Sequence, residues 1–132
     1  NHYELGEIFD ASCTNEDEII YYVRKLQKMG ARNVLVSRAG DGALLVTEDG
    51  SIYRMEAPEG KVKNSVGAGD SMVAGFLAGS LKSGDYKTAL YYGVAAGSAS
   101  AFSEGLADWD TIRLVLDSLS AKGKLPIDEK RK

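Results

Sequence analysis

The stretch Asn64-Ser-Val-Gly-Ala-Gly-Asp70-Ser71 combines two glycines with a carboxylate and leads into an apolar segment. It follows a polar connector and precedes helical periodicity, so it predicts a tight turn that opens a helix. The backbone N–H groups of Gly67, Ala68 and Gly69 would then point into one concavity at the positive end of the helix dipole, which forms an anion site. A carboxylate beside an anion site suits phosphoryl transfer. Asp70 would act as general base on the attacking hydroxyl, while the amides stabilise charge on the phosphate.

Other interpretations of this stretch depend on particular residues. Asp70 as a helix N-cap, with the glycines only making a turn, stays open at this point. A dinucleotide fingerprint needs glycine where Met72 stands, and the Gly-Lys-Ser/Thr run of a Walker A loop is absent. A hydrolase of the Gly-Asp-Ser type needs a suitable histidine. The chain's only histidine is His2, and no aspartate stands three residues ahead of it, so this interpretation is disfavoured.

The residues before this stretch predict one helix followed by three short strands. Residues 15–29 place Ile19, Ile20, Val23 and Leu26 on one stripe, as in an amphipathic helix. Three short runs are strand-like: residues 33–37 are apolar and β-branched, and residues 43–47 and 51–56 each follow a turn. The pair Asp49-Gly50 predicts a tight hairpin between the second and third runs.

The residues after it predict three helices. Residues 70–82 place Val73, Phe76, Leu77 and Leu81 on one face. Residues 86–102 are rich in alanine and glycine, which indicates close packing against another element. Residues 109–120 have Asp108 as a plausible N-cap, and beyond residue 123 we expect a frayed, charged end. The order indicates an α/β fold in which helices cover a sheet.

Composition excludes several classes of protein. The 132 residues suffice for one domain, and a net charge of −3 gives no electrostatic reason for a nucleic-acid partner. No apolar run approaches the roughly 20 residues of a membrane helix. The single cysteine, Cys13, excludes an internal disulfide, so we expect a cytoplasmic protein with no membrane association.

Residues 64–79, Asn-Ser-Val-Gly-Ala-Gly-Asp-Ser-Met-Val-Ala-Gly-Phe-Leu-Ala-Gly, closely resemble the carboxyl-terminal signature of the ribokinase-like, or PfkB, family of carbohydrate kinases. The resemblance implies a ribokinase-like fold, ATP as phosphoryl donor and Mg²⁺ as cofactor. It also assigns Asp70 as the catalytic base and the Gly67, Ala68 and Gly69 amides as the anion hole.

Three other stretches resemble the family in the right order. Asn1-His2-Tyr3-Glu4 matches an Asn-x-x-Glu motif, which implies that Glu4 helps to hold Mg²⁺ through water. Residues 37–42 lie where the family usually has Ser-Leu-Gly-x-x-Gly, a loop that touches the nucleotide; Arg38 and Ala39 depart from that pattern, and a plain hairpin turn is the alternative. The helix over residues 91–101 matches one wall of the adenine pocket. The ATP-binding residues implied in this way are Ser37, Arg38, Ala39, Gly40, Asp41, Gly42, Gly69, Asp70, Ala96 and Ser100.

The resemblance implies that residues 1–132 are the carboxyl-terminal, nucleotide-binding part of a kinase, without the sugar-binding half and its lid. The implied reaction converts D-fructose 1-phosphate to fructose 1,6-bisphosphate. Members acting on tagatose 6-phosphate are the nearest alternative, and a regulatory nucleotide-binding module without turnover is an alternative of another class. We expect the chain alone to be inactive, and a homodimer of the uncut protein stays open.

Overall fold

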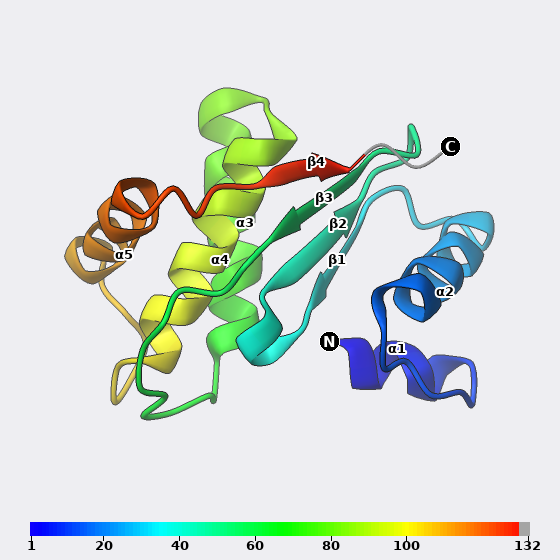
Figure 1. Cartoon of the computed structure of the whole chain (residues 1–132), viewed down its shortest axis with the longest axis horizontal. Helices are drawn as coiled ribbons and strands as arrows, with labels where there is room; N and C mark the ends of the chain where they lie inside the picture. The colour runs from blue at the N-terminus through cyan, green and yellow to red at the C-terminus, as the bar shows by residue number, and fades with distance from the viewer. Residues whose placement is uncertain (130–132) are drawn as a thin grey trace.

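A four-stranded antiparallel sheet lies between two groups of helices in the computed structural model, which describes residues 1–129 (Figure 1). One group precedes the sheet in sequence and the other follows its first three strands. The elements are α1 (His2–Ile8), α2 (Glu16–Lys28), β1 (Val34–Ser37), a short 3₁₀ turn (Ala39–Asp41), β2 (Ala43–Val46), β3 (Ile52–Met55), α3 (Ala68–Ser83), α4 (Tyr86–Ala101), α5 (Trp109–Ala121) and β4 (Ile127–Glu129).

Strand β2 shows why helices are needed on both faces of the sheet. The strand order is β1-β2-β3-β4, and all four residues of β2 are buried. Because side chains alternate along a strand, Leu44 and Val46 join the core under α1 and α2. Ala43 and Leu45 join the second core, with Leu90 of α4. The predicted α/β arrangement is therefore confirmed, including the antiparallel β2–β3 pair across the Asp49-Gly50 turn.

The first helical layer holds one predicted helix and one that we did not predict. Helix α2 begins after its N-cap Asn15 and buries Ile19, Ile20 and Val23, as its periodicity predicts. Helix α1 was not expected. Its start is a capping box, in which Asn1 accepts from the Glu4 N–H and the Glu4 carboxylate reaches back to the Asn1 nitrogen.

Helices α3 and α4 pack closely because small residues line the seam between them. A Cβ added at Gly75 would lie 2.6 Å from the Tyr92 carbonyl oxygen and 2.7 Å from the Ala96 Cβ. The expectation that the Ala/Gly-rich helix packs closely against another element is confirmed. The face of α3 with Val73 and Leu77 is instead largely exposed, because the glycine side makes the contact.

The chain end differs from our expectation. Residues 127–129 are not frayed: they form β4, which pairs antiparallel with β3 from Ile52↔Glu129 to Arg54↔Ile127. The backbone hydrogen bonds to β3 order this segment, although its own residues are largely exposed. Residues 130–132, which we also placed in the charged end, lie outside the described part of the chain.

Candidate functional site

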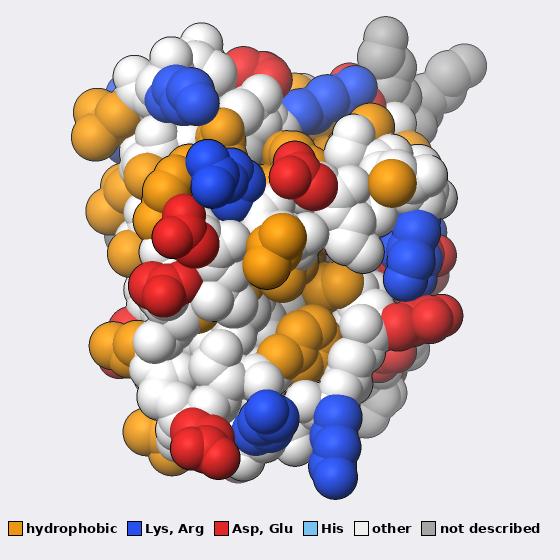
Figure 2. All heavy atoms as spheres, turned by 90° about the vertical axis from the view of Figure 1, so that its left-hand side faces the viewer, with side chains coloured by type: hydrophobic (Ala, Val, Ile, Leu, Met, Phe, Trp, Pro, Cys, Tyr) orange, Lys and Arg blue, Asp and Glu red, His pale blue; other side chains and the backbone are white. Residues whose placement is uncertain are grey.

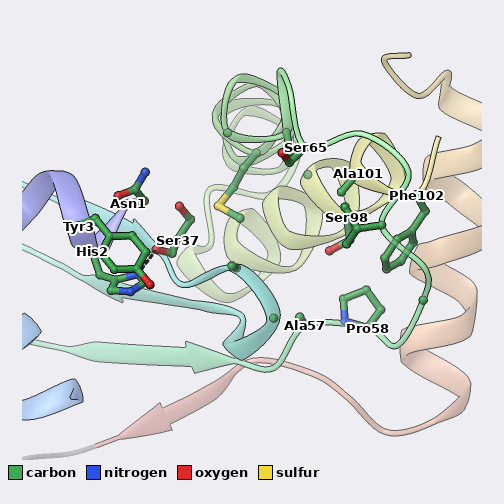
Figure 3. Close-up of a pocket in the computed structure, with 18 residues that line it drawn as sticks. Asn1, His2, Tyr3, Ser37, Ala57, Pro58, Ser65, Ser98, Ala101 and Phe102 are labelled. Carbon is green, nitrogen blue, oxygen red and sulfur yellow. Dashed lines mark hydrogen bonds between the residues drawn. The ribbon is translucent and has the colours of Figure 1, made fainter. Parts of the chain in front are cut away.

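A cavity of about 520 Å³ opens where the end of β1, the start of α3 and the end of α4 meet (Figure 3). This volume lies within the range of small-molecule sites. His2 and Tyr3 lie on one side and Phe102 on the other, with Pro58 near the floor in this view. The wall is mostly apolar, and its polar part comes from Asn1, His2, Tyr3, the serines and backbone groups. The residues that line it are Asn1, His2, Tyr3, Ser37, Ala39, Gly40, Ala57, Pro58, Gly60, Val62, Ser65, Ala68, Gly69, Met72, Gly97, Ser98, Ala101 and Phe102.

The loop that follows β1 supplies one edge of the cavity. Of its predicted nucleotide-binding residues, Ser37, Ala39 and Gly40 line the cavity. Asp41 is exposed outside it, and Gly42 is buried against β3, where an added Cβ would lie 1.9 Å from the Met55 carbonyl oxygen. Arg38 turns away from the cavity toward α2, where its guanidinium binds Glu16. The loop therefore reaches the cavity with half of the residues that we assigned to it.

The start of α3 supplies a second edge. Gly67 is the N-cap in the left-handed conformation, with φ +81°, and Ala68 and Gly69 line the cavity. The Ala68 N–H donates to the Ser65 carbonyl oxygen at 3.2 Å. The N–H groups of Gly67, Gly69 and Asp70 have no protein acceptor among residues 1–129. Free N–H groups at a helix start attract anions. Two of the three amides that we assigned to the anion hole are thus unbonded, and that of Ala68 is bonded within the turn.

Asp70 is the third residue of α3, directly after Gly69 of the cavity wall. Its side chain is exposed, and within the described part of the chain its carboxylate makes no hydrogen bond or ion pair. The N-cap interpretation of Asp70 is wrong, because the cap position belongs to Gly67 and no side chain caps this helix. A carboxylate in the first turn still interacts favourably with the helix dipole.

The Asn64 side chain and backbone N–H groups beside it hold the connector before α3 against the end of α4. Asn64 accepts from the Val66 N–H through Oδ1 and donates from Nδ2 to the Glu104 carbonyl oxygen, each at 3.0 Å. The Lys63 and Asn64 N–H groups both donate to the Ala101 carbonyl oxygen. We quoted Asn64 in the sequence motif without giving it a role. An asparagine that opens a turn can accept from the N–H two residues later, and this preference is the sequence signal for the role of Asn64.

The α4 residues that face the cavity lie one position along the helix from the two that we predicted. Gly97, Ser98 and Ala101 line the cavity, whereas Ala96 and Ser100 do not. Ala96 packs against Gly75, and the buried Ser100 hydroxyl donates to Ser71 Oγ at 2.8 Å. Successive helix residues are about 100° apart, so small residues one position away face the neighbouring helix instead.

The proposed metal residue Glu4 lies on α1 and does not line the cavity, although the three residues before it do. Its carboxylate binds the Asn1 nitrogen at 2.6 Å. No group of three His, Cys, Asp or Glu side chains that could hold a metal is present within residues 1–129. Mg²⁺ in nucleotide enzymes is commonly held by phosphates, waters and one or two carboxylates. Glu4 as a single carboxylate therefore fits a metal that nucleotide phosphates also bind.

Sequence reasoning missed the large apolar side chains of the cavity. Met72 comes from α3 and Phe102 from the end of α4, and both line it. Phe102 packs on the backbone at Gly60, where an added Cβ would lie 2.5 Å from the ring. Flat apolar walls beside unbonded amides suit a nucleotide, with its base between side chains and its phosphates at the helix start.

The fold and the cavity together define an α/β protein with unbonded N–H groups at a helix start beside a mostly apolar cavity of about 520 Å³. No helix within residues 1–129 has the length and apolar character needed to cross a membrane. Residues 1–112 match the pfkB family carbohydrate kinases, so the chain belongs to this family. Its fold is that of the ribokinase-like kinases.

Curated relatives and a solved structure support this placement. The 1-phosphofructokinase of Bacillus subtilis (strain 168) is 49% identical over 116 residues, which cover 88% of this chain and 38% of that protein. The D-tagatose-1-phosphate kinase of Bacillus licheniformis is 38% identical over 109 residues, covering 82% of this chain and 36% of that protein. The crystal structure of a candidate phosphofructokinase from Staphylococcus aureus superposes with a TM-score of 0.83 at 34% identity, covering 98% of this chain and 40% of that chain. The chain thus spans about two fifths of the length of these proteins.

Proposed function

We propose that residues 1–132 are the carboxyl-terminal, nucleotide-binding part of a kinase that transfers a phosphoryl group from ATP to D-fructose 1-phosphate. The proposal rests on family membership and on the 49% identity to a 1-phosphofructokinase. The sugar-binding residues would come from the amino-terminal half of the fold. A sugar phosphate and MgATP are the partners that follow from this proposal.

The position of Asp70 is the observation that carries the catalytic part. Its exposed carboxylate has no protein partner in the described structure and stands one residue after Gly69, at a helix start with unbonded N–H groups. In our proposal the carboxylate accepts the proton of the sugar hydroxyl as that oxygen attacks the γ-phosphorus, the bond from this phosphorus to the β,γ-bridging oxygen breaks, and ADP leaves. The N–H groups of Gly67, Gly69 and Asp70 bind the oxygens of the transferred group. Mg²⁺, when bound with the nucleotide, neutralises phosphate charge, and Glu4 would reach it through water.

The test is the Asp70→Asn variant of the full-length kinase, which keeps the side chain's shape and removes its charge. We expect kcat to fall by at least about 10²-fold, the lower range for loss of a general base, while ADP affinity changes little. Asp110→Asn is the matched control, because Asp110 is also an acidic residue in the first turn of a helix, α5. A kcat within twofold of the parent in Asp70→Asn would overturn the assignment of the base. A parent protein that binds ADP without any turnover would instead favour a binding module.

The name of one relative suggests an alternative substrate. The tagatose kinase that the chain resembles is named for tagatose 1-phosphate, whereas the sequence motif left tagatose 6-phosphate as the alternative. A coupled assay of ADP release should compare fructose 1-phosphate with both tagatose phosphates. The highest kcat/KM on fructose 1-phosphate is expected, and a higher value on either tagatose phosphate would replace the proposed substrate.

A further inference from the structure

The loop between β1 and β2 contains a residue in an unfavourable backbone conformation. Ala39 has φ +49°, in the left-handed region that favours glycine, and it lines the cavity. Its N–H and that of Gly40 have no protein acceptor within residues 1–129, so both remain available to a ligand. An alanine stays in this conformation only where the surrounding structure holds it.

Two backbone hydrogen bonds that hold the loop begin at the residue before it. The Arg38 N–H donates to the Gly42 carbonyl oxygen at 2.8 Å, and the Arg38 carbonyl oxygen accepts from the Asp41 N–H at 3.0 Å. Whatever fixes Arg38 therefore fixes both ends of the loop. The Gly42 N–H also donates to the Ala39 carbonyl oxygen at 3.1 Å, so the two bonds of Arg38 and this third bond together hold Ala39.

A partly buried ion-pair network fixes Arg38. Its Nη1 lies 3.1 Å from Oε1 of Glu16, and the two side chains are only 16% and 22% exposed. The other Glu16 oxygen, Oε2, lies 3.2 Å from Nη2 of Arg54 on β3, and Arg54 also binds Glu129 of β4. Glu16 is the first residue of α2, which is held to the sheet by buried Ile19 and Val23. The network thus connects the loop to a helix and to two further strands.

We propose that Glu16 is a positioning residue for nucleotide binding, which acts through Arg38 to hold Ala39 and Gly40 in the conformation that exposes their N–H groups to the cavity. The inference rests on the proposed kinase function. Arg54 orients the Glu16 carboxylate by occupying its second oxygen. Arg38 and Ala39 are the two positions at which this loop departs from the usual family pattern, and the network explains both departures. Without the anchored Arg38, Ala39 would leave its unfavourable positive-φ conformation and the loop would change shape.

The test replaces Glu16 by glutamine in the full-length kinase. A glutamine offers one oxygen and one NH₂ group, and the NH₂ cannot accept from an arginine, so one of the two ion pairs is lost. ADP is the probe, measured by calorimetry. We expect its Kd and the KM for ATP to rise about fivefold or more through lost preorganisation, while kcat at saturating ATP stays within twofold.

Two further variants separate positioning from folding. In Glu16→Gln combined with Ala39→Gly, most of the lost ADP affinity should return, because glycine adopts a positive φ without the alanine's penalty. Glu48→Gln is the matched control, since the Glu48 carboxylate also binds an arginine, Arg32, at 2.9 Å, and lies beyond the other end of the β1–β2 pair. We expect no change in ADP affinity for this variant.

Hydrogen exchange tests the network independently of activity. The amides of Asp41 and Gly42, which donate within the loop, should exchange faster in Glu16→Gln than in the parent or in Glu48→Gln. Unchanged exchange at these amides would overturn the inference whichever function the kinase has. A lower melting temperature with unchanged ADP affinity would also overturn it and leave Glu16 a purely structural role. Absent sugar-kinase activity in the parent would instead refute the proposed function.

Discussion

Gly67 and Gly69 stand two residues apart at the start of α3 and face different constraints. At Gly67 the backbone has φ +81°, and an added Cβ would lie 2.8 Å from Leu106 Cδ2. At Gly69 an added Cβ would meet nothing within 4 Å, and the residue lines the cavity. The first glycine is therefore required by the turn, and the second leaves space that a ligand can use.

We predict opposite consequences for alanine at these two positions. Gly67→Ala should lower the free energy of unfolding by about 1–2 kcal/mol through the cost of the left-handed conformation. Gly69→Ala should not lower stability, because alanine favours a helix and nothing lies within 4 Å of the added Cβ. It should weaken ADP binding, because the methyl group takes up space at the cavity wall. Thermal unfolding and ADP titration of the full-length protein measure the two effects. Equal effects of both variants on stability would contradict this division.

At the scale of elements, the seam between α3 and α4 depends on glycine. An added Cβ at Gly75 meets the Tyr92 carbonyl oxygen at 2.6 Å, and backbone atoms cannot move aside without separating the helices. We expect Gly75→Ala to destabilise the protein by about 1–3 kcal/mol, as overpacking does. Gly105→Ala is the control, since an added Cβ there meets nothing within 4 Å. Urea unfolding would disprove the packing argument if both variants had the same midpoint.

The start of α4 contributes a pH dependence. Asp85 is its N-cap and accepts from the N–H groups of Lys87 and Thr88. The hydrogen bond from the Thr88 hydroxyl, followed by these backbone bonds, lowers the pKa of Asp85 from its ordinary value of 3.8. Because the folded-state pKa is depressed, this stabilisation is present above about pH 4 and is lost as the pH falls through the lowered pKa.

We predict that Asp85→Asn flattens the acid side of the stability profile. Asparagine is an equally good N-cap and carries no titrating carboxyl group. The difference in melting temperature between parent and variant should therefore shrink or reverse in favour of the variant between pH 4 and pH 3. Parallel curves over that interval would show that another group dominates the acid loss of stability.

For the molecule as a whole, two exposed features indicate an incomplete surface. On α3, Val73, Leu77 and Leu81 are 54%, 55% and 89% exposed, one helical turn apart. Strand β1 is an edge of the sheet and offers unpaired backbone groups. Figure 2 shows hydrophobic side chains among charged ones on the α5 side, with a column of them along one edge of the view. In our proposal the amino-terminal half of the kinase covers the α3 stripe and the β1 edge.

We predict that the 132-residue chain alone self-associates and has no measurable kinase activity on fructose 1-phosphate. Positioning of the two reactants can supply about 7–11 kcal/mol of the barrier reduction, and the sugar would not be held. Sedimentation should show smaller assemblies for Leu77→Lys combined with Leu81→Lys than for Leu114→Lys, an exposed leucine on α5. A monomeric, fully active chain would refute both the division of the fold and the surface assignment.

Local patterns predicted much of the fold, and their limits are physical. The stripe of α2 follows from burial on one face, and the three strands follow from strand-like runs set between turn residues. Neighbours in sequence encode both patterns. The Asn1 and Glu4 capping box of α1 was also readable but was taken only as a metal motif. Leu77 was read as part of an apolar face, yet it is exposed because glycines make the α3–α4 contact, and hydrophobic periodicity does not register glycine.

The sequence by itself determined the turn before α3, the order of the elements from α2 to α5 and the family. The turn depends on the conformational freedom of glycine, the order of the elements on hydrophobic periodicity, and the family on a long contiguous motif. Only the tertiary structure decided that Gly97, Ser98 and Ala101 face the cavity rather than Ala96 and Ser100, and that residues 127–129 are a strand. It also decided that Arg38 reaches Glu16, 22 residues earlier in the chain. Helix rotation, strand pairing and long-range ion pairs depend on which distant surfaces meet, and local patterns do not encode that.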